Sequence, residues 1–166
     1  WSPNSGILKA EKRGCFGPSE PAAVEAAVDA ARRLGIRHHV ISLEEEFGRD
    51  VLDYYRSSYS AGRTPNPCVV CNRKIKFGAL LRKALDLGIS FDRFATGHYA
   101  RISYCEELAR WQLHKAMDPT KDQSYFLSGL SQEQLAFSLF PLGSMLKSEL
   151  KAFAESKGFE YLIKKK

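Results

Sequence analysis

Apolar residues recur every three or four positions soon after the start of the chain. Within residues 22–34 they are Val24, Ala27, Val28, Ala31 and Leu34, which fall on one face of a helix. Ser19 suits a helix cap, Pro21 suits the first turn, and Gly35 is a typical stop. The pattern therefore predicts an amphipathic helix over residues 22–34.

Further periodic segments predict the remaining elements. Helical spacing is found over residues 44–61, over 67–87 with Gly88 as the stop, and over 147–158. A capping box from Ser131 to Gln134 begins another helix, which ends at residues 140–143. Short apolar runs predict strands at 38–43, as a buried strand, and at 91–96, and residues 99–104 and 110–113 predict a hairpin.

Helices and strands alternate along the chain, which is typical of an α/β fold with a mainly parallel sheet. In such sheets ligands bind beyond the carboxyl ends of the strands. Gly97 and His98 directly follow the strand predicted at 91–96, so they stand where that rule expects a ligand. The 166 residues suit a single domain.

Charge and composition narrow the class of protein. The net charge of +6 attracts phosphate backbones, although many basic proteins bind no nucleic acid. No apolar run approaches the roughly 18 residues that a membrane span needs, and no secretory segment begins the chain. We therefore expect a cytoplasmic protein that does not enter a membrane.

The chain has four cysteines, namely Cys15, Cys68, Cys71 and Cys105. They are sparse and no signal peptide accompanies them. Reactive or metal-binding thiols are therefore more plausible than structural disulfides.

Cys68 and Cys71 lie at the predicted start of the helix over residues 67–87. Asn66 is a good N-cap and Pro67 a good first residue, so both thiols lie on one face of the opening turns. The helix dipole there favours a thiolate, as do the neighbours Arg73, Lys74 and Lys76. Three interpretations stay open, which are a nucleophilic or redox pair, half of a zinc or iron–sulfur site, and cysteines that only pack in the core.

Two further stretches carry polar groups that suit a ligand. Gly97 permits close approach to the backbone, and His98 can donate to a phosphate or a base. Residues 121–126 (Lys-Asp-Gln-Ser-Tyr-Phe) join polar side chains to an aromatic pair, a mixture that suits splayed nucleotides. Taken singly, a surface turn and an ordinary helix start explain these two stretches better than a ligand site does.

Taken together, these stretches resemble the tRNA-specific 2-thiouridylase family. The matching runs are Ala-Gly-Arg-Thr-Pro-Asn-Pro at 61–67, Cys-Asn at 71–72 with Ile-Lys-Phe at 75–77, Thr-Gly-His-Tyr at 96–99, Lys-Asp-Gln-Ser-Tyr-Phe-Leu at 121–127, and Ser-Leu-Phe-Pro-Leu-Gly at 138–143. They occur in the family's order, and several separate motifs at matching spacing argue against a chance match.

The resemblance implies an incomplete Rossmann-like domain of the PP-loop ATPase type, in which helices flank a parallel sheet. It implies that ATP, with Mg2+, adenylates the C2 oxygen of the wobble uridine, and that sulfur from a cysteine persulfide then displaces AMP. A disulfide bond belongs to the implied chemistry. The implied substrates are tRNAs for lysine, glutamate and glutamine, and the implied partner is a cysteine desulfurase or a sulfur-relay protein.

The resemblance also assigns roles to individual residues. Cys71 matches the nucleophilic cysteine, and Gly97 matches a position that touches ATP. Positions that meet the target base or contact tRNA are matched by Asn66, Pro67, Cys68, His98, Lys121, Asp122 and Gln123. Residues 1–166 would form part of the catalytic domain, with 116–166 as its helical, tRNA-contacting extension.

The sequence departs from the family pattern in three places. Cys68 stands where many members have an aspartate, and members with the Cys-x-x-Cys form have been associated with an iron–sulfur cluster held by one further cysteine. The Ser-Gly-Gly-x-Asp-Ser phosphate loop is expected before Trp1, since Ser5-Gly6 lacks its continuation. The persulfide-bearing cysteine is expected after Lys166. We therefore expect these residues alone to be inactive.

Two other hypotheses stay open. The chain can be a basic RNA-binding module with a zinc or iron–sulfur site at Cys68 and Cys71. It can also be a different PP-loop enzyme, such as another tRNA thiolase or an amidating synthetase. The Asn-Pro-Cys run with its downstream Lys-Asp-Gln favours the 2-thiouridylase.

Overall fold

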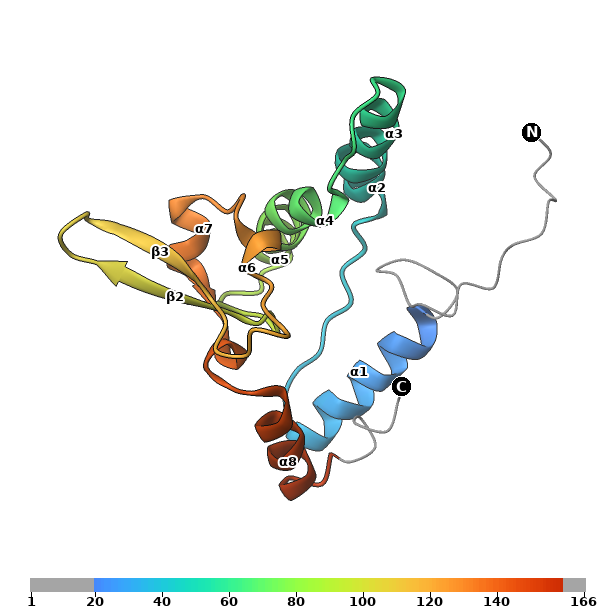
Figure 1. Ribbon diagram of the computed structural model, residues 1–166. Helices are drawn as coiled ribbons and strands as arrows, with labels where there is room; N and C mark the ends of the chain where they lie inside the picture. Colours follow the sequence, from blue (N-terminus) through green and yellow to red (C-terminus); the bar gives the residue numbers. More distant parts are fainter. Residues whose placement is uncertain (1–19, 160–166) are drawn as a thin grey trace. The chain divides into compact units, whose positions relative to one another are not determined.

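The computed structural model describes residues 20–159, and the chain divides after Ser42 into two compact units. The described part of the first unit holds α1 (Glu20–Leu34), drawn in blue in Figure 1. It ends where Gly35 adopts a φ of +66°, which glycine tolerates without strain. The predicted helix is therefore confirmed, while its proposed cap, Ser19, lies outside the described residues.

The strand predicted at residues 38–43 is wrong. Residues 36–43 form neither helix nor strand, and Val40 is 66% exposed. A strand needs a neighbour to complete its backbone hydrogen bonds. No strand within residues 20–159 pairs with this run, so its apolar side chains are not buried in a sheet.

The second unit begins with three joined helical pieces, namely α2 (Glu44–Phe47), the π-helical η1 (Gly48–Leu52) and α3 (Asp53–Ser60). They confirm the helix predicted at 44–61. Val51 and Ser58 are buried, as its periodicity requires, whereas Tyr55 is exposed and packs edge-on against Tyr59.

The next helix also has three pieces, namely α4 (Pro67–Val70), the π-helical η2 (Cys71–Ala79) and α5 (Leu80–Asp86). Asn66 caps it, because its Oδ1 accepts a hydrogen bond from the N–H of Val69 at 3.3 Å. Gly88 has a φ of +75° just beyond its end. The local signals at both ends of this predicted helix are thus confirmed.

The strands form two pairs. β1 (Phe94–Ala95) pairs in parallel with β4 (Ser138–Leu139), and β2 (Ala100–Cys105) pairs antiparallel with β3 (Arg110–Lys115) as the predicted hairpin. The parallel pair joins segments more than forty positions apart, Phe94 facing Ser138. Figure 1 shows the hairpin in yellow extending away from α4 and α5.

The remaining elements are α6 (Ser124–Leu127), α7 (Gln132–Phe137), the 3-10 helix η3 (Pro141–Ser144) and α8 (Lys147–Ser156). The predicted capping box is present, since Ser131 and Gln134 bond to each other's backbone N–H groups. None of the described helices is both long and apolar enough to cross a membrane.

One hydrophobic core holds the motif-bearing segments together. Phe77 of η2, Ala100 of β2, Leu127 of α6 and Phe140 are buried in a single cluster. Phe77 lies at its centre and meets the rings of Phe94 and Phe140 edge-on, at centroid distances of 5.3 and 6.0 Å. The core therefore fixes four segments that are distant in sequence.

Candidate active site

Two sets of hydrogen bonds gather three of the predicted motifs. Asn72 Nδ2 donates to the carbonyl of Phe126 at 3.0 Å, which joins η2 to α6. Gln123 binds Tyr99 twice, since its N–H donates to the Tyr99 carbonyl at 2.8 Å and its Oε1 accepts from the Tyr99 N–H at 3.0 Å. The cysteine segment, residues 97–99 and residues 121–126 therefore surround one region.

The Asn-Pro-Cys segment is fixed at the start of α4. Besides the cap that Asn66 provides, its own N–H donates to the hydroxyl of Tyr54 at 3.3 Å. Cys68 is exposed in the first turn that follows. Two anchors thus hold the backbone while the Cys68 thiol faces outward.

Cys71 lies in a different environment from Cys68. It is only 8% exposed and packs with Val51 and Ile75, to which Leu43 and Phe47 add apolar cover. The two thiols lie three positions apart on the helix as predicted, yet one is open and one is covered. A reaction at Cys71 requires access through this apolar cluster.

Gly97 and His98 follow β1, as the strand-end rule expects. Gly97 is exposed, and a Cβ built there would meet only Leu142 Cδ1, at 3.8 Å. His98 Nδ1 and Thr96 Oγ1 share a hydrogen bond of 2.8 Å. Burial of the ring, and then the charge of Lys76, lower the pKa of His98 to about 4. His98 is therefore a neutral imidazole near pH 7.

Two carboxylates shape the loop that carries the predicted tRNA contacts. Asp118 accepts from Thr120 and from the N–H of Lys147, and these hydrogen bonds hold the pKa of Asp118 below its usual value. Burial tends to raise the pKa of Asp122, but hydrogen bonds from Ala116 and Ser124 outweigh it, and the net shift is downward.

Of the predicted contacts in this loop, Lys121 is exposed, whereas Asp122 and Gln123 use their side chains to hold the backbone. The sequence prediction missed Asp118, Asn72 and Tyr99 as supports of the site. Asp118 lies two positions before Thr120, to which it bonds, a local signal that the sequence does contain. The partners of Asn72 and Tyr99 lie far along the chain and leave no such signal.

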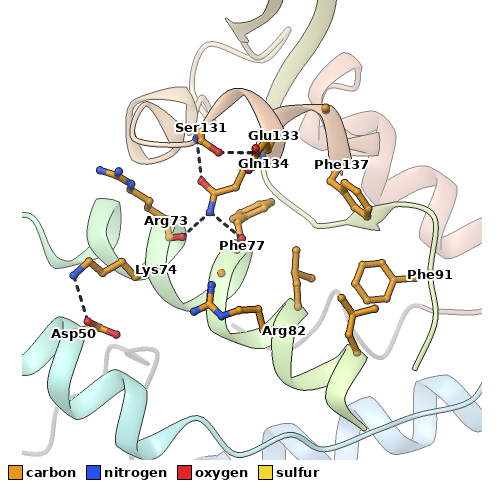
Figure 2. A pocket seen from close by; sticks show the side chains of 14 residues that line it. Asp50, Arg73, Lys74, Phe77, Arg82, Phe91, Ser131, Glu133, Gln134 and Phe137 are labelled. Carbon is orange, nitrogen blue, oxygen red and sulfur yellow. Dashed lines mark hydrogen bonds and ion pairs between the residues drawn. The ribbon is translucent and has the colours of Figure 1, made fainter. Parts of the chain in front are cut away.

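A separate pocket of about 1020 Å3 lies beside η2, α5 and α7 (Figure 2). The Gln134 amide reaches across and donates to the carbonyls of Arg73 and Phe77, both at 2.8 Å. None of the residues predicted to bind ATP or tRNA lines this pocket. We therefore keep the candidate site at the three gathered motifs.

The resemblance implies two cofactors, ATP and an iron–sulfur cluster, and the described residues fit the first better than the second. The open space around Gly97 fits the close approach of a nucleotide. An iron–sulfur cluster needs about four ligands, and residues 20–159 contain no group of three or more His, Cys, Asp or Glu side chains placed to hold a metal. Cys68 and Cys105 are free thiols, so Cys68 and Cys71 are not joined in a disulfide.

Comparison with known proteins gives one family. Residues 4–166 match the family described as tRNA methyl transferase HUP domain. The chain is 42% identical to the tRNA-specific 2-thiouridylase MnmA of Desulforamulus reducens, over 95% of this chain and 42% of that protein. It is 52% identical to the MnmA of Desulfotalea psychrophila over 78% of this chain and 36% of that protein, and 44% identical to that of Carboxydothermus hydrogenoformans over 93% and 41%. The chain thus spans about two fifths of these relatives.

Proposed function

Because this chain belongs to the tRNA methyl transferase HUP domain family, we propose that it is the nucleotide-binding, cysteine-bearing part of a tRNA-specific 2-thiouridylase. Family membership confirms the resemblance seen in the sequence and the α/β, Rossmann-like fold class. The family description names methyl transfer, whereas the relatives' names state thiolation. Thiols beside the gathered motifs favour sulfur chemistry.

One observation carries the proposal. The bonds from Asn72 to Phe126 and between Gln123 and Tyr99 bring the cysteine segment, the glycine after β1 and the Lys-Asp-Gln run to one region. Their separation along the chain means that only the tertiary structure can assemble them. A thiol, an open backbone for a nucleotide and a loop with an exposed lysine, Lys121, are parts that ATP-dependent thiolation of RNA can use.

The proposed reaction proceeds in two substitutions. The C2 oxygen of the target uridine attacks the α-phosphorus of ATP and pyrophosphate leaves, so the oxygen becomes part of a good leaving group. The terminal sulfur of a cysteine persulfide then attacks C2, and AMP leaves with the oxygen. Mg2+ bound together with ATP would neutralise charge on the phosphates.

Cys71 completes the transfer in this proposal. Its thiolate attacks the inner sulfur of the adduct, the S–S bond breaks, and the thiolated base leaves with the outer sulfur. Cys71 and the persulfide-bearing cysteine are then joined in a disulfide, which an external thiol must reduce before the next cycle. Phe47 and Val51 pack over Cys71, so their side chains must move before Cys71 can make this attack.

The other parts of the site bind and orient. Gly97 lets ATP approach the backbone, and neutral His98 presents a hydrogen-bonding nitrogen to the tRNA. Asn66, Pro67 and Cys68 face the target base, and Lys121 meets the phosphate backbone while Asp122 and Gln123 hold its loop. The proposed substrates are tRNAs for lysine, glutamate and glutamine in the cytoplasm, with sulfur from a cysteine desulfurase or a relay protein.

The test is thiolation of tRNA by the full-length protein with ATP and a sulfur donor, read by mass spectrometry of the nucleosides. We expect 2-thiouridine with the wild type and none with Cys71→Ala. Cys105→Ala is the matched control, because Cys105 lies on β2 and belongs to none of the gathered motifs. Full activity of Cys71→Ala would refute its assignment as the nucleophile.

A further inference from the structure

Two aromatic side chains on α6 face solvent. Tyr125 is 65% exposed and Phe126 is 36% exposed, and their rings meet edge-on at a centroid distance of 5.5 Å. Leu127, the next residue, is only 1% exposed and supplies the contact of α6 with the core. Packing within the described unit therefore leaves most of Tyr125 and about a third of Phe126 open to a ligand.

The backbone that carries the rings is held by hydrogen bonds before α6 and within it. Before it, Asp122 accepts from the hydroxyl and N–H of Ser124, and Gln123 is joined to Tyr99 by two hydrogen bonds. Within it, the Phe126 carbonyl accepts from Asn72. An aromatic pair on a fixed backbone loses little conformational freedom when a ligand stacks on it.

The same contacts set the rings beside the cysteine segment. Figure 1 shows α4 and α6 side by side, and Gly129 lies so close to Val69 that a Cβ there would be 3.2 Å from Val69 Cγ1. Cys68 precedes Val69 and lies one helical turn before Asn72, which bonds to Phe126. The exposed thiol and the exposed rings thus share one neighbourhood.

Basic side chains lie on the cysteine-bearing helix and just before α6. Residues 67–79 contain Arg73, Lys74 and Lys76 and no acidic residue. The Arg73 side chain passes Gly129, where a built Cβ would lie 3.7 Å from Arg73 Cδ, and Lys121 is exposed just before α6. Within the described part of the chain neither Arg73 nor Lys121 is in a salt bridge, although the charge of Lys121 contributes to lowering the pKa of Asp118. Both cations can approach a phosphate.

We propose that Tyr125 and Phe126 form a stacking platform for an unpaired RNA base next to the nucleotide that meets the cysteine segment. Aromatic rings flanked by cations are the usual means of holding splayed bases, because each base offers a π face and each nucleotide a phosphate. An apolar protein segment would need no cations at the rim. This proposal rests on the proposed function and adds the element that holds the neighbouring base.

The test uses the full-length protein and an RNA stem-loop that carries 2-aminopurine beside the target uridine, since stacking quenches this base. We expect Tyr125→Ala to weaken binding about tenfold to hundredfold and to abolish the quenching, as loss of one stacking ring does. Tyr125→Phe keeps the ring and should bind within about twofold of wild type. Tyr59→Ala is the matched control, because Tyr59 is a similarly exposed tyrosine on α3.

The possible outcomes distinguish failure of the stacking platform from failure of the proposed function. Wild-type protein that neither binds nor thiolates the RNA contradicts the proposed function itself. Wild-type protein that does both, with unchanged affinity and quenching in Tyr125→Ala, overturns the platform alone. Normal RNA binding by Tyr125→Ala together with lost capture of an apolar peptide would assign the rings to a protein partner instead and would equally overturn it. Unchanged circular dichroism confirms that each variant folds.

Discussion

The side chain of Asn72 donates a hydrogen bond to the backbone carbonyl of Phe126, 54 positions further along the chain. Asn72 is only 4% exposed, and it follows Cys71 directly. Its Oδ1 is buried and has no hydrogen-bond partner within the described residues. A buried amide with one satisfied end holds α6 against the helix that bears both cysteines, so the geometry of the site depends on it.

Replacement of Asn72 by alanine removes this link. The Phe126 carbonyl then loses its donor, and we expect the free energy of unfolding to fall by about 1–3 kcal/mol. Thiolation by the full-length protein should fall as well, because α6 is no longer fixed. Urea unfolding and steady-state kinetics measure the two effects.

Ser128→Ala is the control for the Asn72 variant. Its hydroxyl donates to the Tyr125 carbonyl in the same segment, but this bond is exposed and local. We expect a change below about 0.5 kcal/mol. Equal effects of the two variants would show that the bond from Asn72 to Phe126 does not hold the site.

The two cysteines of the motif should differ in reactivity. Cys68 is exposed and Cys71 is 8% exposed beneath an apolar cluster. Under native conditions we expect iodoacetamide to modify Cys68 at least tenfold faster than Cys71, and the difference should disappear in denaturant. Peptide mass spectrometry over time measures both rates in one sample. Equal native rates would mean that the cover over Cys71 is open in solution.

Much of the helical framework could be predicted because its signals are local. Asn66 with Pro67, the capping box of Ser131 and Gln134, and Gly88 each act within a few residues of their own position. The hairpin could be predicted for the same reason, since its two strands are adjacent in sequence. These elements therefore follow from short windows of the chain.

The support of the candidate site could not be predicted in this way. Asn72 and Phe126 lie 54 positions apart, and nothing in either neighbourhood reveals the other. The strand predicted from the apolar run at residues 38–43 was wrong because a hydrophobic run indicates only a preference for strand structure. Whether a strand forms depends on a neighbouring strand, and within the described residues none pairs with this run. The different exposure of Cys68 and Cys71 likewise depends on η1, which contributes Val51.

Two glycines should respond differently to the same substitution. A Cβ at Gly143 would overlap the backbone carbonyl of Ala100, which cannot move without disturbing β2. A Cβ at Gly97 meets only the end of the Leu142 side chain. We expect Gly143→Ala to cost roughly 1–3 kcal/mol or more, as overpacking does, and Gly97→Ala to leave the thermal midpoint within a few degrees of wild type.

Gly97→Ala also tests the assignment of ATP to this position. If a nucleotide approaches the Gly97 backbone, the added methyl should weaken ATP binding at least several-fold in the full-length protein while the fold persists. Isothermal titration with ATP measures this. Unchanged affinity in a folded Gly97→Ala protein would move the nucleotide away from the end of β1.

The pH dependence of stability should report the neutral state of His98. Burial of its ring, and then the charge of Lys76, lower the pKa in the folded protein to about 4, from the usual value of 6.5. Well above pH 6.5 the ring is neutral in both the folded and the unfolded state. As the pH falls from 6.5 toward 4, only the unfolded state gains a proton, so the free energy of unfolding decreases over this window.

His98→Gln removes this proton uptake but keeps a polar side chain near Thr96. We therefore expect the difference in stability between wild type and His98→Gln to change most between pH 6.5 and 4 and to level off well above pH 6.5. Urea unfolding across pH 4–8 gives that difference, and NMR titration of the His98 ring gives its midpoint directly. A midpoint near 6.5 would show that the ring is solvated rather than packed beside Phe77 and Phe140.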